Sequence, residues 1–170
     1  ITESQFRGRI RKILKESGQE FIPQQFATSD VNEANEHKYV SYFTNGIMLL
    51  TINDVQADDP NIPEDFQAVY KAWSLQRDLD KTYCHSDIQA LALKAVRAGI
   101  IPDKFQGFTD ILGDEAQDFS MVQYLLLKTL VGDGRLCLVG DSEQTIYSWR
   151  GAVPGLLGRY FRHGPGTKII

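Results

Sequence analysis

The chain has 170 residues, of which 42% are hydrophobic and 24% charged, and its formal net charge is −4 at pH 7. This composition is typical of a globular domain with a real core, and it argues against a surface built wholly around a nucleic acid backbone. No run approaches the roughly 18 to 20 apolar residues of a membrane span and no signal-peptide pattern opens the chain, so we expect an intracellular protein without a membrane partner.

The first predicted element is a helix in the stretch "TESQFRGRIRKILKES". Thr2 and Gln5 form a capping-box pattern, apolar residues follow at helical spacing, and Gly18 is placed to end the helix. Its basic residues can either contact phosphates or form the solvated face of an amphipathic helix; they are Arg7, Arg9, Arg11, Lys12 and Lys15. Residues 54–65 form an acidic, turn-rich linker that cannot contact phosphates.

The following region combines a loop with further helices. Residues 19–37 contain Pro23 and a polar run, so we expect a loop or short broken helices there. The stretch "YVSYFTNGIMLLTI" is compatible with a helix or a strand, because periodicity alone does not separate the two. Apolar spacing predicts two more helices, each with one side facing a core, over residues 66–79 and 87–97. Residues 1–98 are therefore predicted to form a mainly helical lobe.

After Gly99 the pattern changes to strand, helix and strand. The run "TDIL" before Gly113 predicts a strand buried on both faces, "SMVQYLLLKTLVG" a helix, and "RLCLVGD" a second strand. Such a βαβ unit has parallel strands. Cys137 in the second strand is predicted to be a buried small hydrophobe, and neither it nor Cys84 has metal-ligand spacing. Gly113 is unexpected, because a β-branched residue would pack a strand better.

Acidic residues follow both predicted strands. Asp114 and Glu115 come directly after the first strand, and Asp141 follows the second. Because ligands bind beyond the carboxyl ends of parallel strands, these carboxylates can hold a hydrated Mg²⁺ ion against phosphates. As an alternative, Asp118 could cap a helix beginning near Phe119, where acids oppose the helix dipole. The two strands bring acids to one edge, which favours the metal site, although Asp118 can still serve as a cap.

The stretch "VGDSEQTIYSWRGA" adds polar and aromatic side chains just beyond this edge. Gln144 is of the type that can sense a terminal phosphate. Tyr147 and Trp149 lie beside Arg150, and such rings suit stacking against unpaired bases, worth roughly 1 to 3 kcal/mol per base. Taken alone, the two aromatic residues fit an ordinary core at least as well.

Two of these stretches resemble motifs of a known family. "ILGDEAQD" and "VGDSEQTIYSWRGA" resemble motifs II and III of the UvrD/Rep/PcrA-type superfamily one DNA helicases, in the right order and at the right separation. The resemblance is strong over residues 108–152, looser over residues 66–170 and only positional before that. It implies an α/β fold: a partial P-loop NTPase (RecA-like) parallel sheet with helices over residues 99–170, the C-terminal half of motor domain 1A, and a 1B-like helical lobe over residues 1–98.

The resemblance also implies roles at the nucleotide site. Asp114 would help coordinate Mg²⁺, and Glu115, beside the metal, would activate the water that attacks ATP. Gln144 would contact the terminal phosphate with Asp141 nearby, and Arg150 would pair with carboxylates of the motor core. The implied cofactors are therefore ATP and Mg²⁺.

On the DNA side, Tyr147 and Trp149 would contact single-stranded DNA, and Gln117 and Asp118 would belong to the network that couples the nucleotide and DNA sites. The implied activity is ATP hydrolysis coupled to translocation on single-stranded DNA and to unwinding of duplex junctions, in the 3′ to 5′ direction. The implied partners are DNA and the remaining helicase domains. Such a motor would work in the cytoplasm at the nucleoid, or in the nucleus.

The chain also departs from the family pattern. These residues contain no GxxxxGK[ST] loop, since "GPGTK" at residues 164–168 has the wrong order and spacing. We expect the chain to begin after that loop and to end before the second motor domain, so the chain alone should hydrolyse ATP poorly or not at all. Cys84, His85 and Ser86 replace residues that are commonly acidic or aromatic in the family, while Asp87 is retained. His85 is expected to be an exposed or packing residue.

Two other functions remain open from the sequence. The first is a non-catalytic single-stranded DNA-binding module derived from a helicase, whose salt-sensitive binding would weaken on Trp149→Ala and would not depend on nucleotide. The second is a metal-dependent nuclease that uses the same carboxylates and loses cleavage on Asp114→Ala. No dedicated nuclease spacing occurs in the sequence.

Overall fold

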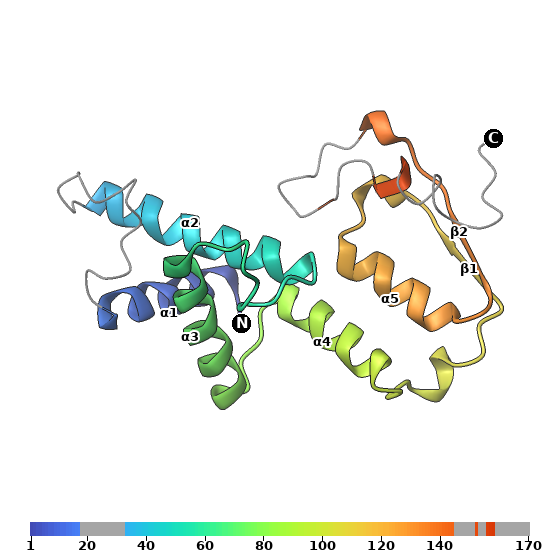
Figure 1. Ribbon diagram of the computed structural model, residues 1–170, viewed down its shortest axis with the longest axis horizontal. Coiled ribbons are helices and arrows are strands. Elements are labelled where there is room, and N and C mark those ends of the chain that lie inside the picture. Colours follow the sequence, from blue (N-terminus) through green and yellow to red (C-terminus); the bar gives the residue numbers. More distant parts are fainter. Residues whose placement is uncertain (18–32, 145–151, 153–155, 159–170) are drawn as a thin grey trace. The chain divides into compact units, whose positions relative to one another are not determined.

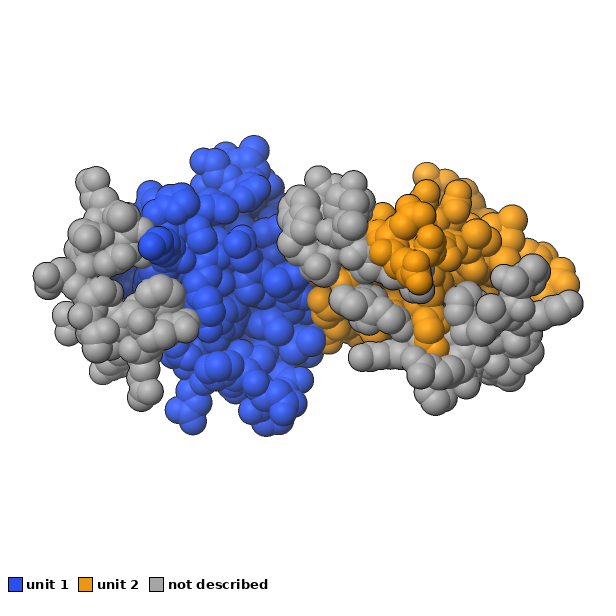
Figure 2. Space-filling view, turned by 90° about the horizontal axis from the view of Figure 1, so that it is seen from above, with its two compact units in different colours: residues 1–51, 55–88 blue, residues 52–54, 89–170 orange. Residues whose placement is uncertain are grey.

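The structure is a computed structural model that describes residues 1–17, 33–144, 152 and 156–158 (Figure 1). The chain divides into two compact units, coloured separately in Figure 2. Unit 1 comprises residues 1–51 and 55–88, and unit 2 comprises residues 52–54 and 89–170. The division falls within a helix, after residue 88, about ten residues before the boundary predicted between residues 98 and 99. The assignment of the two parts to the 1B lobe and to motor domain 1A stays a prediction.

Unit 1 is helical. It contains α1 (Glu3–Glu16), α2 (Glu33–Ile52), α3 (Glu64–Asp80) and the first turn of α4 (His85–Arg97). The predicted capping box of α1 is confirmed, because the Gln5 amide N–H donates to Thr2 Oγ1 at 3.3 Å and the Thr2 N–H donates to Gln5 Oε1 at 2.9 Å. The helix ends at Glu16 with Ser17 as its cap, before the expected Gly18, which lies outside the described residues.

The ambiguous stretch "YVSYFTNGIMLLTI" is helical, as part of α2. Val40, Phe43 and Ile47 are buried at spacings of three and four residues, so a tertiary core selects the helix over the strand. The Phe43 and Phe66 rings stack with centroids 5.1 Å apart. A Cβ on Gly46 would lie 2.7 Å from Phe66 Cε2, so this glycine permits the close approach of α3. Helix α2 begins at Glu33, inside the predicted loop, and residues 18–32 are not described.

Helix α3 supplies most of the remaining core of unit 1. Phe66, Val69, Tyr70 and Trp73 are buried as their spacing predicts, whereas Leu79, predicted on the same side, is exposed because it lies in the last turn. The Phe6 and Trp73 ring centroids are 4.6 Å apart. The buried core comprises Phe6, Ile10, Ile13, Leu14, Val40, Phe43, Ile47, Ile62, Phe66, Val69, Tyr70 and Trp73.

The junction of α3 and α4 is organised by one buried acid, Asp87. Its Oδ1 accepts from Arg77 Nη1 at 2.8 Å, and its Oδ2 accepts from the backbone N–H of Cys84 at 2.9 Å and from the Cys84 thiol at 2.8 Å. Burial, and then the hydrogen bond to Asp87, raise the pKa of the Cys84 thiol. His85 is exposed, as expected. The retained aspartate therefore ties two helices together.

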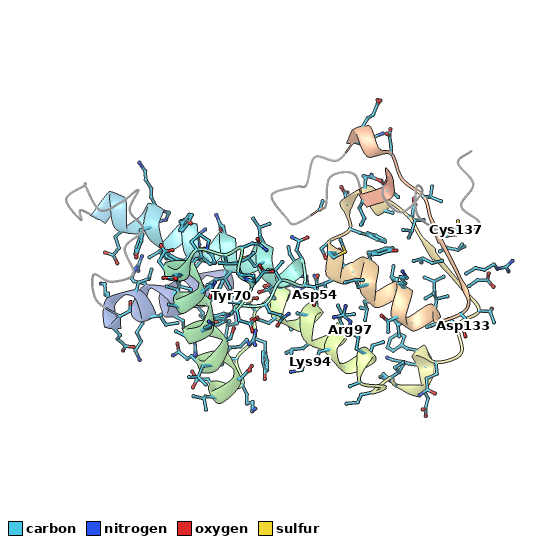
Figure 3. All side chains as sticks on the ribbon, viewed as in Figure 1. Asp54, Tyr70, Lys94, Arg97, Asp133 and Cys137 are labelled. Carbon is cyan, nitrogen blue, oxygen red and sulfur yellow. The ribbon has the colours of Figure 1, made fainter. Side chains whose placement is uncertain are left out.

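Unit 2 contains the predicted βαβ arrangement. Strands β1 (Asp110–Gly113) and β2 (Arg135–Leu138) are parallel, with α5 (Met121–Val131) between them in the chain, and the register runs from Asp110 opposite Arg135 to Gly113 opposite Leu138. Residues 52–54 join this unit, in which Arg97 Nη1 donates to Asp54 Oδ2 at 2.8 Å (Figure 3). The α/β class is confirmed. Within the described residues no helix is long and apolar enough to cross a membrane.

Burial of the two strands is not as predicted. The prediction that the first strand is buried on both faces is wrong, because Leu112 is 81% exposed. The prediction that Cys137 is buried is wrong too, since this register partner of Leu112 in β2 is exposed. Gly113 and Leu138 are buried instead. A Cβ on Gly113 would lie 2.8 Å from Leu138 Cδ2 and 3.1 Å from Phe119 Cε2, so a β-branched residue would clash there.

The predicted role of Asp118 as a helix cap is also wrong. Helix α5 begins at Met121, and its cap is Ser120, whose Oγ accepts from the Gln123 N–H at 3.3 Å while Gln123 Oε1 accepts from the Ser120 N–H at 2.9 Å. Asp118 lies in a preceding 3₁₀ turn, η4 (Ala116–Asp118). The serine, two residues further on, accepts a hydrogen bond from one of the free N–H groups in the first turn of the helix, that of Gln123.

Candidate functional site

The basic residues of α1 do not form a free cationic surface. Each is paired with an acid: Arg7 with Glu3, Arg9 with Asp80, Arg11 and Lys15 with Glu36, and Lys12 with Glu16. Because these pairs neutralise the charge locally, phosphate binding there would have to break them. The structure therefore supports the alternative of a solvated amphipathic face.

The acids after β1 lie on a tightly held turn. The strand ladder continues past both strands, since the Val139 N–H donates to Gly113 O at 2.8 Å and the Ala116 N–H donates to Val139 O at 2.9 Å. Between these bonds, Asp114 and Glu115 are exposed. Glu115 has φ 51° and ψ 37°, a left-handed conformation that is uncommon for residues other than glycine. Its N–H donates to Asp114 Oδ1 at 2.9 Å, so the two carboxylates are presented from one hydrogen-bonded turn.

Gln117 joins this turn to the end of β2. The side chain is buried, and its Nε2 donates to Glu115 Oε2 at 2.6 Å while its Oε1 accepts from the Asp141 N–H at 3.0 Å. The acids predicted to meet at one edge of the sheet therefore do belong to one connected group. Gln117 makes the connection, through both ends of a single amide.

Asp141 organises the turn after β2. Its Oδ1 accepts from the Glu143 N–H at 2.9 Å, and its Oδ2 accepts from Gln144 Nε2 at 2.9 Å. These two bonds, the backbone one first, hold the pKa of Asp141 below its usual range, so this exposed carboxylate is ionised at neutral pH. Gln144 is thereby brought to the same edge as Asp114 and Glu115.

The other predicted site residues do not join this group in the described structure. Asp118 Oδ1 is buried and has no hydrogen-bond partner among the described residues, and its backbone N–H donates to Glu115 O at 2.9 Å. Tyr147, Trp149 and Arg150 lie outside the described residues. Sequence reasoning missed Gly140, which precedes Asp141 and packs against Gln117. The available signal was its position directly after the second predicted strand and before Asp141.

The acidic residues at this edge fit a partly hydrated Mg²⁺ ion better than a metal ion held entirely by protein side chains. In the described part of the chain, no three His, Cys, Asp or Glu side chains gather in a way that could hold a metal ion. Mg²⁺ commonly needs only one or two carboxylates, because it keeps several waters and also binds substrate phosphates. Asp114 and Glu115 are exposed oxygen donors at a strand end and meet that requirement, whereas both oxygens of Asp141 already accept hydrogen bonds.

Comparison with known proteins gives a consistent result. The family model described as "UvrD/REP helicase N-terminal domain" matches residues 2–162. Over 121 residues the chain is 31% identical to "DNA helicase II" of Escherichia coli, and the aligned part is 68% of this chain and 16% of the relative. It is 33% identical over 113 residues to "ATP-dependent DNA helicase Rep" of Buchnera aphidicola, covering 65% of this chain and 17% of the relative. The chain thus spans about a sixth of the length of these relatives.

Proposed function

The chain belongs to the UvrD/REP helicase family, and on that premise we propose that it is part of an ATP-dependent DNA helicase motor. The motor would couple ATP hydrolysis to translocation on single-stranded DNA and to unwinding of duplex junctions in the 3′ to 5′ direction. The observation that carries the proposal is the connected edge after β1 and β2, where Glu115, Gln117, Asp141 and Gln144 form one hydrogen-bonded series. The compartment would be one that holds DNA, at the nucleoid or in the nucleus.

In this proposal the residues at the edge divide the work of phosphoryl transfer. Mg²⁺, when bound, would neutralise charge on the phosphates of ATP. Asp114 would hold it, with Glu115 beside it. A free oxygen of the Glu115 carboxylate would accept a proton from the water that attacks the terminal phosphorus. Gln144 would donate from its amide to the terminal phosphate, and Asp141 would keep that amide in place until ATP arrives.

The DNA side of the motor rests on residues outside the described structure. Tyr147 and Trp149 would contact single-stranded DNA, Trp149 by stacking, and Arg150 would pair with carboxylates of the motor core. The finer assignment to a RecA-like P-loop fold belongs to the proposal too. It requires a phosphate-binding loop elsewhere in the polypeptide, because these 170 residues contain no GxxxxGK[ST] sequence.

The test is DNA-stimulated ATP hydrolysis by the full-length protein and by the 170-residue chain. We expect Glu115→Gln to lower kcat of the full-length protein by about 10² to 10⁴-fold, the usual contribution of a general base, with little change in its melting temperature. The chain alone should show little turnover, because most phosphate contacts would be missing. Trp149→Ala should weaken single-stranded DNA binding.

Three outcomes would contradict the proposal. Robust turnover by the 170-residue chain would show that no separate phosphate-binding loop is needed. Salt-sensitive DNA binding that is lost on Trp149→Ala, with no ATP hydrolysis by the full-length protein, would identify a non-catalytic binding module. Magnesium-dependent DNA cleavage that disappears on Asp114→Ala would identify a nuclease.

A further inference from the structure

Gln117 uses its amide in a way that no other side chain of its length can. The residue is only 4% exposed, its Nε2 donates to Glu115 Oε2 at 2.6 Å, and its Oε1 accepts from the Asp141 N–H at 3.0 Å. A glutamate would accept at both ends, a lysine would only donate, and a methionine would do neither to a useful degree. The site therefore requires one side chain that carries a donor and an acceptor side by side, as a primary amide does.

Gly140 creates the space for this amide. A Cβ built on Gly140 would overlap Gln117 Oε1, and it would lie 3.0 Å from the backbone nitrogen of Ala116 and 3.1 Å from that of Gln117. The overlap is with the Gln117 side chain, which would have to move, and the two backbone nitrogens would be in tight contact with the added carbon. Gly140 is required here because the chain after β2 passes directly against the 3₁₀ turn after β1.

From this geometry we propose that Gln117 and Gly140 form a positioning pair, which sets the orientation of the Glu115 carboxylate and holds it in register with the Asp141–Gln144 turn. The inference rests on the proposed function, since it assigns the pair to the water-activating glutamate. Neither residue touches the reacting atoms. Gln117 acts through Glu115 on one side and through the backbone of Asp141 on the other.

The pair has a defined consequence for the reaction. Oε2 of Glu115 is occupied by Gln117, so the bond orients the carboxylate and leaves the other oxygen, Oε1, to receive the proton of the attacking water. The same amide carries the contact to Asp141, whose carboxylate holds Gln144 Nε2 at 2.9 Å. A displacement of Gln144 on a phosphate would therefore be transmitted to Glu115 through three hydrogen bonds. Without the pair, the two turns would stay joined by the backbone bonds of Val139 to Gly113 and Ala116, but this side-chain connection from Gln144 to Glu115 would be lost.

The test uses three variants of the full-length protein, which remove the donor of the amide alone, remove both of its halves, or displace it. Gln117→Glu keeps the acceptor for the Asp141 N–H but removes the donor to Glu115 and adds a negative charge. Gln117→Met removes both halves. Gly140→Ala keeps the glutamine at position 117 but pushes its side chain out of position. The matched controls are Gln76→Glu on α3 and Gly8→Ala on α1, where an added Cβ meets nothing within 4 Å.

Two readouts are needed: amide hydrogen exchange of Asp141 without nucleotide, and kcat and KM for ATP. Gln117→Glu should keep the Asp141 amide protected yet lower kcat about tenfold or more, because a hydrogen bond to a charged group is lost. Gln117→Met and Gly140→Ala should speed exchange of the Asp141 amide about tenfold or more and also lower kcat. KM for ATP should change less than about threefold in all three, since ground-state binding is retained. The controls should change neither readout.

An unchanged kcat in Gln117→Glu would overturn the inference, and so would an Asp141 amide that stays protected in Gly140→Ala. A rise in KM with constant kcat would show that Gln117 serves nucleotide binding instead. If the wild-type full-length protein does not hydrolyse ATP, the proposed function fails. The exchange pattern of Asp141 then still decides whether the Gln117–Gly140 pair joins the two turns.

Discussion

Unit 1 and unit 2 are stabilised in different ways. Among the described residues of unit 1, twelve hydrophobic side chains from α1, α2, α3 and the loop before α3 form one buried cluster. In the described part of unit 2, the buried cluster around the sheet consists of Ala116, Leu138 and Leu157. Hydrogen bonds among Glu115, Gln117, Asp141 and Gln144 connect the two turns at the edge of this sheet. We therefore expect substitutions in unit 1 to act on stability, and substitutions at the edge of unit 2 to act first on activity.

The acidic residues of the two units also differ, in their burial and in how far other side chains pair with them. Asp87 in unit 1 is buried and accepts hydrogen bonds from Arg77 and Cys84, so it is not accessible to a ligand from solvent. Asp114 and Glu115 in unit 2 are exposed. Because an exposed carboxylate keeps an oxygen accessible, it can exchange water for a metal ion or a substrate, whereas a buried, paired acid contributes only to the fold.

The largest expected effect on stability is that of Trp73→Ala, which removes a side chain at the centre of the core of unit 1. Removal of a fully buried aromatic side chain should lower the free energy of unfolding by about 3 to 5 kcal/mol. Urea denaturation followed by far-UV circular dichroism measures it. Trp73→Phe is the control and should cost less, because Trp73 Nε1 has no hydrogen-bond partner among the described residues. Equal losses for the two variants would show that packing of the large ring is not what stabilises unit 1.

A second prediction tests whether unit 2 also depends on close packing. Gly113→Val should lower the free energy of unfolding by about 1 to 3 kcal/mol, because the added atoms would overlap Leu138 and Phe119. Gly8→Ala in α1 is the control and should raise stability by up to about 1 kcal/mol, since its site is open and helical. Thermal denaturation gives both values. A stabilising Gly113→Val would mean that the strand accepts a β-branched residue after all.

A third prediction concerns pH and the buried thiol of unit 1. Burial raises the pKa of Cys84, so the folded chain holds this proton at pH values where the unfolded chain releases it. Stability from this group is thus fully present below the unfolded pKa of about 8.5 and is lost as pH rises through the folded pKa. Denaturation at a series of pH values between about 8 and 10 should show this decline.

Cys84→Ser is the matched variant for that series, because its hydroxyl can still donate to Asp87 but does not titrate in this range. The decline in stability should be absent in Cys84→Ser. The exposed Cys137 should react with iodoacetamide much faster than Cys84 at neutral pH. Equal reaction rates for the two thiols would contradict the burial of Cys84.

The smallest expected effect is that of the paired charges on α1. The double variant Arg11→Gln, Lys15→Gln removes two exposed pairs with Glu36 and should change the free energy of unfolding by no more than about 1 kcal/mol. Single-stranded DNA affinity of the full-length protein should change less than in Trp149→Ala. Fluorescence anisotropy at several salt concentrations measures this. A large drop in the salt dependence of binding would instead place α1 on the DNA path.

Much of the local structure could be predicted from the sequence. The capping box of Thr2 and Gln5, the helical spacing of Phe66 to Trp73 and the strand, helix and strand order after Gly99 are confirmed. The clustering of Asp114, Glu115 and Asp141 with Gln144 followed from that order, because parallel strands end at the same edge. The capping box and the helix and strand patterns depend on residues close to one another in the chain, and the shared edge follows from the parallel order of the strands. That is why the sequence predicts them.

Tertiary structure alone decided which positions are buried and which groups meet. Leu112 and Cys137 look like core residues but are exposed, and the glycines at positions 113 and 140 are required by Phe119, Leu138 and Gln117. The helix of "YVSYFTNGIMLLTI" was likewise selected by packing against α3. Burial and close approach depend on what another segment places opposite a residue, and local periodicity carries no information about that. For the acids of this chain, the sequence determined their chemistry, and the fold determined which of them remain open to a ligand.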